Sequence, residues 1–208
     1  DLSPLDTSSA VSFRQMLYGC SSLKEIDLSG FKTSKATTFA SMLNGCSSLT
    51  RVDVTGFDLS SAKDLSMFFF NCKSLAEADL ATTGMSKVTT LYGAFGGCSS
   101  LRSVDVSALD VSSVSNFAYC FSGCAKLEKL DLSGWDASSA RDVNHFLSGR
   151  ASLKEVDLSG LRTEGATDFS YFLYGCKSLE ELDLTGISTA SAKNGYGMFS
   201  GTTSLATV

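Results

Sequence analysis

Hydrophobic and polar positions along the chain repeat with a period of 26 residues, without insertion or deletion. Around Leu23, positions 23, 26 and 28 are apolar and positions 24, 25 and 27 are polar. The leucine at the start of this pattern recurs at Leu49, Leu75, Leu101, Leu127, Leu153, Leu179 and Leu205. A repeat of this length predicts a solenoid, because one unit cannot bury its apolar face until neighbouring units stack on it.

Each repeat has the spacing of one short β-strand. The segment 23–28 follows a Leu-x-x-hydrophobic-x-Leu pattern, which is typical of a strand that turns one side toward a core. Consecutive strands must run parallel, because each repeat returns the chain in the same sense. Ser29-Gly30 then predicts a turn, after which Phe31 returns to the core. Equivalent strands are expected near 49–54, 75–80, 101–106, 127–132, 153–158 and 179–184.

The second half of each repeat has the spacing of a short helix. Thr33 or Ser34 is the expected N-cap, and Ala36, Phe39 and the pair at 42–43 follow at helical spacing. A glycine is expected to end each helix. These glycines are Gly19, Gly45, Gly97, Gly123, Gly149, Gly175 and Gly201. The predicted fold class is therefore α/β, a solenoid of eight 26-residue coils, each with a short parallel strand and a short helix.

The repeat predicts one elongated domain over residues 1–208, because no linker or change of composition interrupts it. Its start and stop at the same phase favour a segment of a longer chain. The expected units are 1–26, 27–52, 53–78, 79–104, 105–130, 131–156, 157–182 and 183–208.

Composition narrows the classes of function. Hydrophobic residues make up 43% of the chain and charged residues 19%, enough apolar surface for a continuous core. The net charge is −5 and the basic residues are scattered, which argues against a nucleic-acid partner. No apolar run approaches the roughly 20 residues that span a bilayer. We therefore expect neither a nucleic-acid surface nor a membrane span in this segment.

The cysteines form a ladder in the sequence. Six of the seven occupy one repeat position, namely Cys20, Cys46, Cys72, Cys98, Cys124 and Cys176, while Arg150 and Thr202 fill it in the other two units. No C-x-x-C pair occurs, so no structural metal is expected. Two interpretations remain: a file of small buried thiols, or disulfides between adjacent coils. An in-register ladder gives each thiol two equal partners, so specific pairing is poorly encoded.

An aspartate also recurs in every repeat, and like charges about 5 Å apart repel by roughly 1 kcal/mol in water. Either the Ser or Thr two residues on and the turn amides donate hydrogen bonds to each carboxylate, or the row binds divalent cations. Glu181 and Asp183 are the candidate metal ligands, since their surroundings lack a basic residue. The aspartate ladder consists of Asp27, Asp53, Asp79, Asp105, Asp131, Asp157 and Asp183, with Asp1 before it.

Tyr119, His145 and Tyr171 share one repeat position in three consecutive units. If exposed, they form a partner-binding stripe; if half-buried, they cover the edge of the core. His145 is the only histidine, and phosphate-binding and dinucleotide-binding motifs are missing. We therefore predict that the chain is not an enzyme and needs no cofactor.

The sequence resembles a known family. Residues 16–37 read Met-Leu-x-Gly-Cys-Ser-Ser-Leu-Lys-Glu-Ile-Asp-Leu-Ser-Gly-Phe-Lys-Thr-Ser-Lys-Ala-Thr. This is similar to the BspA-like leucine-rich-repeat surface proteins, whose repeats carry Met-Phe-x-x-Cys-x-Ser-Leu-x-x-Leu-Asp-Leu-Ser-x-Phe-Asp-Thr-Ser. Asp58, Asp110 and Asp136 restore the second Asp of that pattern, and the resemblance spans the whole chain. Departures are Arg150, the segment 81–84, and the glycines at 195 and 197.

The resemblance implies a secreted or cell-surface protein of the adhesion type. Two functions stay open at this point. One is an extracellular or cell-surface repeat module for adhesion or protein binding, with a protein or glycan partner. The other is a structural spacer or filament subunit that stacks end to end through its terminal coils.

Overall fold

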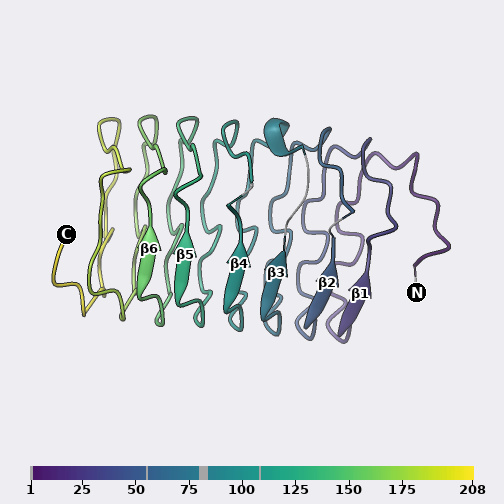
Figure 1. Cartoon of the computed structure of the whole chain (residues 1–208), viewed down its shortest axis with the longest axis horizontal. Coiled ribbons are helices and arrows are strands. Elements are labelled where there is room, and N and C mark those ends of the chain that lie inside the picture. Colours follow the sequence, from purple (N-terminus) through teal and green to yellow (C-terminus); the bar gives the residue numbers. More distant parts are fainter. Residues whose placement is uncertain (1, 55, 80–83, 108) are drawn as a thin grey trace.

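The computed structural model describes residues 2–54, 56–79, 84–107 and 109–208. Its strands lie side by side along the long axis, and the two termini are at opposite ends (Figure 1). The elements in chain order are β1 (Glu25–Asp27), β2 (Arg51–Asp53), β3 (Glu77–Asp79), the single-turn 3₁₀-helix η1 (Met85–Lys87), β4 (Ser103–Asp105), β5 (Lys129–Asp131) and β6 (Glu155–Asp157).

The strands pair in parallel with an offset of 26 residues, which confirms the predicted sense and register. Ile26 lies opposite Val52, Ala78 opposite Val104, and Leu130 opposite Val156. Each strand has three residues rather than the six expected. After β1, β2, β4, β5 and β6, a buried leucine or valine follows directly on the aspartate. Near 179–184 the described residues form no strand, but Glu181 makes a parallel bridge with Thr207.

The helix predicted in each repeat is wrong: apart from η1, the described residues contain no helix. The reason lies in where the backbone amides donate. Phe39 N–H donates to Asp64 O at 2.9 Å and Leu43 N–H donates to Phe68 O at 3.1 Å, both in the next coil. Between them, Met42 N–H closes a tight turn to Phe39 O at 3.0 Å. Every second amide is therefore used between coils and cannot build an α-helix.

The residues expected at the helix ends serve the coil-to-coil contacts instead. Thr33 Oγ1 accepts from Asp58 N–H at 2.8 Å and donates to Asp58 O at 3.0 Å, which ties it to the following coil. Gly45 has a φ of 79° and ends a turn, where its N–H donates to Phe70 O at 2.8 Å. The left-handed conformation predicted for this glycine is thus present without the helix.

A second ladder runs along the turn side of the molecule. Parallel bridges join residues that are 26 positions apart, so the coils are linked on the side opposite the strands as well. The bridged residues are Ser12, Thr38, Asp64, Thr90, Asn116, Asp142, Asp168 and Asn194.

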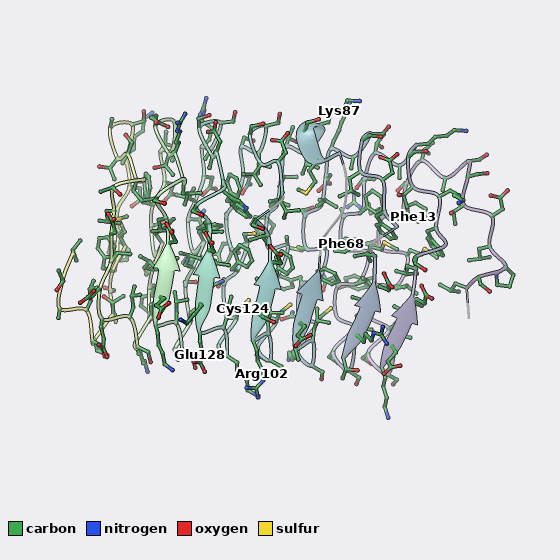
Figure 2. All side chains as sticks on the ribbon, in the orientation of Figure 1. Phe13, Phe68, Lys87, Arg102, Cys124 and Glu128 are labelled. Atoms are coloured by element: carbon green, nitrogen blue, oxygen red, sulfur yellow. The ribbon has the colours of Figure 1, made fainter. Side chains whose placement is uncertain are left out.

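The core lies between the strand side and the turn side. The repeat leucine is fully buried from Leu49 to Leu179, and Phe95 stacks on Phe121 with ring centroids 5.1 Å apart. Figure 2 places Phe68 and Cys124 inside the coils and Lys87 and Arg102 at their rim. Within the described residues, no helix is long or apolar enough to cross a membrane.

Candidate functional site

Six aromatic side chains from five consecutive repeats form one continuous surface row, which we call the aromatic stripe. It consists of Tyr92, Tyr119, His145, Tyr171, Tyr174 and Tyr196. His145 lies between Tyr119 and Tyr171, with ring centroids 4.5 Å away on each side. Tyr92 contacts Tyr119 at 5.8 Å, and Tyr171 contacts Tyr196 at 5.3 Å and Tyr174 at 5.4 Å. All these contacts are edge-to-face, the geometry that aromatic pairs prefer.

The predicted partner residues form the centre of this stripe. Tyr119, His145 and Tyr171 are half-buried, which is the case in which they cover the edge of the core, whereas Tyr174 and Tyr196 are 46% and 70% exposed. The sequence did not lead us to Tyr92 and Tyr196, because each lies one position earlier in the repeat than the predicted three. The signal that could have found them is the glycine that follows each, Gly93 and Gly197, in place of the next aromatic.

The three central aromatics have a strained backbone. Tyr119, His145 and Tyr171 have φ of 58°, 52° and 56°. This left-handed region costs an L-residue about 1 to 2 kcal/mol, and glycine fills the same repeat position at Gly93 and Gly197 with φ of 60° and 63°. The coil therefore needs no aromatic ring at this position and would be less strained with glycine.

Polar side chains three residues earlier in the chain position the rings of His145 and Tyr171. Asp142 Oδ1 accepts from Asn144 N–H at 3.0 Å, and Asp168 Oδ1 accepts from Ser170 N–H at 2.8 Å. Each turn places the following residue, His145 or Tyr171, in the left-handed conformation at the surface. Burial lowers the pKa of His145, while the nearby carboxylates of Asp168 and Asp142 act in the opposite direction. His145 Nδ1 is buried without a hydrogen-bond partner.

The aspartate ladder forms hydrogen-bonded turns at the ends of the strands. Asp27 Oδ1 accepts from Ser29 N–H at 2.9 Å and from Ser29 Oγ at 2.6 Å. The backbone bond, at 2.8 to 3.0 Å, recurs at Asp105, Asp131, Asp157 and Asp183. The side chain of Asp79, together with Asp1, lies outside the described residues. These bonds offset the mutual repulsion of the row.

We expect the stability of the fold to decrease as the pH falls below about 4. Hydrogen bonds from Ser29 lower the pKa of Asp27, and those from Ser107 lower the pKa of Asp105. Since the folded-state pKa lies below the unfolded value, the unfolded chain binds more protons as the pH falls. The stabilisation is complete above the unfolded pKa and is lost as the pH falls through the folded one. Urea midpoints measured from about pH 6 to about pH 2 test this.

Asp105→Asn provides the control, because the amide keeps an acceptor oxygen but does not titrate. Its urea midpoint should vary less over the acidic range than that of the unmodified chain. A midpoint that stays constant through this range in the unmodified chain would contradict the expectation.

The cysteine ladder is a file of thiols along the core. All seven cysteines are free, Cys20 is exposed and the other six are buried. Each buried ladder thiol donates to the carbonyl 29 residues earlier, as Cys72 does to Leu43 O at 3.2 Å and Cys98 to Phe69 O at 3.1 Å. Cys120, the seventh cysteine, stands outside the ladder position and is fully buried in the core.

A water-soluble thiol reagent should therefore label one cysteine per native chain, at Cys20. Burial raises the pKa of Cys46 to about 11 and that of Cys72 to about 12, so neither supplies the reactive thiolate near neutral pH. Mass spectrometry of the native and urea-unfolded chain should find one and seven labels, matching one exposed and six buried thiols. Labelling of Cys72 or Cys98 in the native chain would show that the ladder thiols are accessible to solvent, and would contradict this expectation.

Arg150 interrupts the ladder and is fully buried. Its Nε donates to Phe121 O at 3.2 Å, the carbonyl that a ladder thiol would use. Its Cζ lies 5.1 Å from the centre of the Phe121 ring. Both Nη1 and Nη2 are buried without a hydrogen-bond partner. The sequence marked Arg150 as a departure but gave no sign that its charge enters the core.

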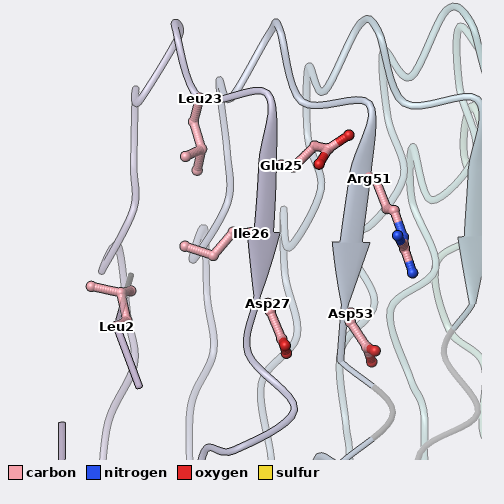
Figure 3. A pocket seen from close by; sticks show the side chains of 7 residues that line it. All are labelled: Leu2, Leu23, Glu25, Ile26, Asp27, Arg51 and Asp53. Carbon is pink, nitrogen blue, oxygen red and sulfur yellow. The ribbon is translucent and has the colours of Figure 1, made fainter. Parts of the chain in front are cut away.

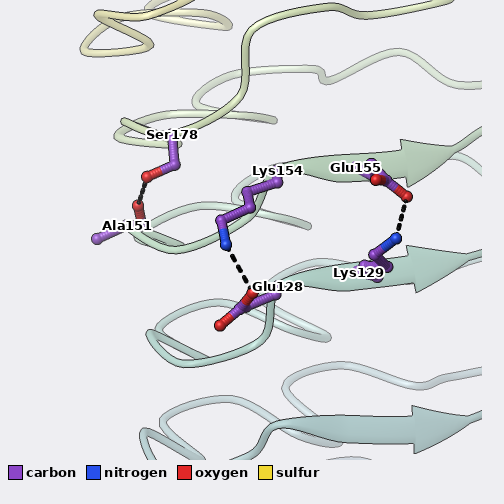
Figure 4. A network of polar contacts seen from close by, with 6 residues as sticks. All are labelled: Glu128, Lys129, Ala151, Lys154, Glu155 and Ser178. Atoms are coloured by element: carbon purple, nitrogen blue, oxygen red, sulfur yellow. Dashed lines mark hydrogen bonds and ion pairs between the residues drawn. The ribbon is translucent and has the colours of Figure 1, made fainter.

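The strand face carries exposed ion pairs between adjacent repeats. Lys129 Nζ lies 2.7 Å from Glu155 Oε2, and Lys154 Nζ lies 2.8 Å from Glu128 Oε2 (Figure 4). Pairs this exposed contribute at most about 1 kcal/mol each. Their main effect is to favour the observed register between the two repeats.

The candidate metal ligands Glu181 and Asp183 are exposed on the same face. Asp183 Oδ1 accepts from Thr185 N–H at 2.8 Å. Among the residues that the structure describes, no three His, Cys, Asp or Glu side chains are grouped to hold a metal ion. A cation site at Glu181 and Asp183 therefore stays a prediction from the sequence.

A shallow hollow lies at the outer edge of β1. Figure 3 shows Leu23 and Ile26 pointing to the side of β1 away from β2, while Asp27 and Asp53 point the same way as each other. The hollow is lined by Leu2, Leu23, Glu25, Ile26, Asp27, Arg51 and Asp53.

Parallel strands in 26-residue register, with the repeat leucine buried from Leu49 to Leu179, are the arrangement of a leucine-rich-repeat solenoid. The chain matches the family described as "Mycoplasma protein of unknown function, DUF285" over residues 1–103, 63–181 and 89–207. Because these matches together cover almost the whole chain, the protein belongs to this family. Its repeats are of the BspA-like leucine-rich kind that the sequence predicted.

Other comparisons give more distant likenesses. No curated protein matches the chain in sequence. A leucine-rich-repeat protein of T. pallidum is 19% identical, with 93% of this chain and 70% of that chain covered and a TM-score of 0.45. A leucine-rich-repeat protein from Bacteroides ovatus is 18% identical, with 92% and 56% covered and a TM-score of 0.41. A leucine-rich cell-surface protein from Faecalibacterium prausnitzii is 14% identical, with 93% and 74% covered and a TM-score of 0.37.

Proposed function

We propose that the chain is a non-enzymatic binding module of an extracellular or cell-surface protein. In this proposal the eight repeats form one solenoid domain over residues 1–208. Its aromatic stripe, centred on Tyr119, His145 and Tyr171, contacts a protein partner and serves adhesion or protein binding. The extracellular location rests on the resemblance to BspA-like surface proteins.

One observation carries the proposal: three consecutive repeats place an aromatic ring at a backbone position that favours glycine. Tyr119, His145 and Tyr171 have φ between 52° and 58°, and they are half-buried, so they cover the edge of the core and leave part of their surface to a partner. The left-handed conformation recurs at this position in other repeats, as at Gln15, Ser41 and Met67, so the turn presents whichever side chain stands there, and in three consecutive repeats that side chain is aromatic. Tyrosine is also enriched where proteins contact partners, since it supplies a large, rigid surface with a polar end.

The experiment uses a displayed peptide library, selected on the whole chain and on a variant that lacks the central rings. The variant is Tyr119→Gly, His145→Gly and Tyr171→Gly combined, because Gly93 and Gly197 already occupy this repeat position. Lys129→Ala with Glu155→Ala is the matched control on the strand face. We expect the selected peptides to bind the unmodified chain and the control variant equally, and not to bind the glycine variant. Equal binding to the glycine variant would overturn the proposal.

The hollow at β1 supports the alternative of end-to-end stacking. Leu2, Leu23 and Ile26 give it an apolar wall, and Ile26 belongs to the row in which each residue lies opposite its counterpart in the next repeat. A further coil, from another repeat or a second copy, would cover this wall. Light scattering against concentration tests the alternative: mass that rises with concentration and falls on Ile26→Glu supports stacking, and constant mass removes it.

A further inference from the structure

We infer that the aromatic stripe binds cationic side chains, and that its partner is a protein segment that presents arginines. This inference rests on the proposed function and specifies the chemistry of the partner. Three features of the stripe support it: the rings, the carboxylates beside them, and the absence of a paired cation among the described residues there.

The aromatic rings of the stripe attract cations. An aromatic ring carries negative charge on its face, so a guanidinium or ammonium group near the ring is attracted by about 0.5 to 1 kcal/mol at an exposed site. The rings in contact, from Tyr92 to Tyr196, extend across five repeats. Tyr174 and Tyr196, which are 46% and 70% exposed, leave much of their rings accessible to a partner.

Two carboxylates add negative charge beside the rings. Asp142 and Asp168 are half-buried and lie in the repeats of His145 and Tyr171, and both interact electrostatically with His145. Asp142 also interacts with Tyr119. Charges that are partly removed from water act more strongly than fully solvated ones. Rings and carboxylates thus produce a negative potential in the same place.

Among the described residues, no cation forms an ion pair with these carboxylates. Arg141 precedes Asp142, but its Nη1 donates to Ser139 O at 3.2 Å and Ala140 O at 2.8 Å. Neither Asp142 nor Asp168 takes part in an ion pair within the described residues. Burial lowers the pKa of His145, which keeps the imidazole largely neutral near pH 7.

Arginine fits this arrangement better than lysine does. Its planar guanidinium stacks on aromatic faces and donates to a carboxylate through two parallel N–H groups. One arginine can therefore contact a tyrosine ring of the stripe and Asp142 or Asp168 together. The strand face differs, because there exposed lysines already pair with Glu128 and Glu155.

The test titrates the isotope-labelled whole chain with an acetylated and amidated peptide that alternates glycine and arginine. The matched control peptide carries citrulline, the neutral analogue of arginine, at the same positions. Amide chemical shifts locate the contact, at a salt concentration of about 0.15 M to screen non-specific attraction. We expect shifts around Tyr119, His145 and Tyr171 and at least about five-fold weaker binding of the citrulline peptide.

Two variants separate the stripe from the general negative charge of the chain. Asp142→Asn with Asp168→Asn should weaken the arginine peptide at least about five-fold, since two counter-charges are removed. Glu180→Gln with Glu181→Gln, which removes two charges from the strand face, should leave binding unchanged. Equal binding of the citrulline peptide, shifts confined to the strand face, or no saturable binding at millimolar peptide would each overturn the inference. If library peptides without basic residues bind the stripe, this inference fails while the proposed function stands.

Discussion

Replacing Arg150 with methionine is expected to raise the free energy of unfolding by about 2 kcal/mol. The guanidinium is fully buried, and its Nη1 and Nη2 find no hydrogen-bond partner. A buried donor without an acceptor costs about 1 to 3 kcal/mol. Against this stand the bond from Nε to Phe121 O and the contact with the Phe121 ring. Methionine keeps the length of the side chain and removes the unpaired donors.

Urea denaturation of Arg150→Met beside Arg162→Met measures the effect. Arg162 is exposed, so its replacement should change stability by no more than about 0.5 kcal/mol. Arg150→Cys would restore the ladder thiol but leave part of the arginine volume empty, and we expect it to stabilise less than methionine does. A clear destabilisation by Arg150→Met would show that the guanidinium has a partner in the core.

Gly160→Ala is expected to lower the free energy of unfolding by roughly 2 to 3 kcal/mol. A methyl group at Gly160 would overlap the carbonyl oxygen of Ser133 in the preceding coil. Both groups belong to the backbone, so relief requires one coil to move away from the next. The interiors of stacked coils are close-packed, and such a shift is transmitted to neighbouring side chains.

Gly30→Ala is the matched control, because Gly30 occupies the same repeat position and a methyl group there would contact nothing within 4 Å. We expect its effect to stay within about 0.5 kcal/mol. Sequence alone would rate both substitutions alike, since Thr82 and Ala108 stand at this position in other repeats, outside the described residues. Equal effects of Gly160→Ala and Gly30→Ala on the urea midpoint would mean that the coils are not packed as closely as described.

The strands and their register could be predicted from the sequence, while the turn half of each coil could not. When the repeat length is constant, the alternation of apolar and polar residues around Ile26 and Val52 allows only one register between neighbouring strands. The spacing of Phe39, Met42 and Leu43 fits a helix equally well as a series of tight turns, because both bury residues three and four apart. What decides between them is the acceptor of each backbone amide, which in this chain lies in the next coil.

The candidate site shows the same division. Tyr119, His145 and Tyr171 could be found because they share a repeat position. The sequence could not show that their backbone is left-handed, because that conformation results from the turns that Asn116, Asp142 and Asp168 close. It also could not show that Tyr92 and Tyr196 complete the stripe. These two residues stand one repeat position earlier than the other three, and Gly93 and Gly197 occupy the position of the aromatic residue.

The claim that the aromatic stripe serves binding rather than folding is tested most directly by a variant with glycine at positions 119, 145 and 171. The quantity to measure is its free energy of unfolding. If the rings serve binding rather than folding, relief of backbone strain offsets most of the lost ring contacts. We therefore expect a loss below about 1 kcal/mol per position. A loss near 3 to 5 kcal/mol per position, as for an aromatic residue of a core, would contradict it and make the stripe part of the structural core.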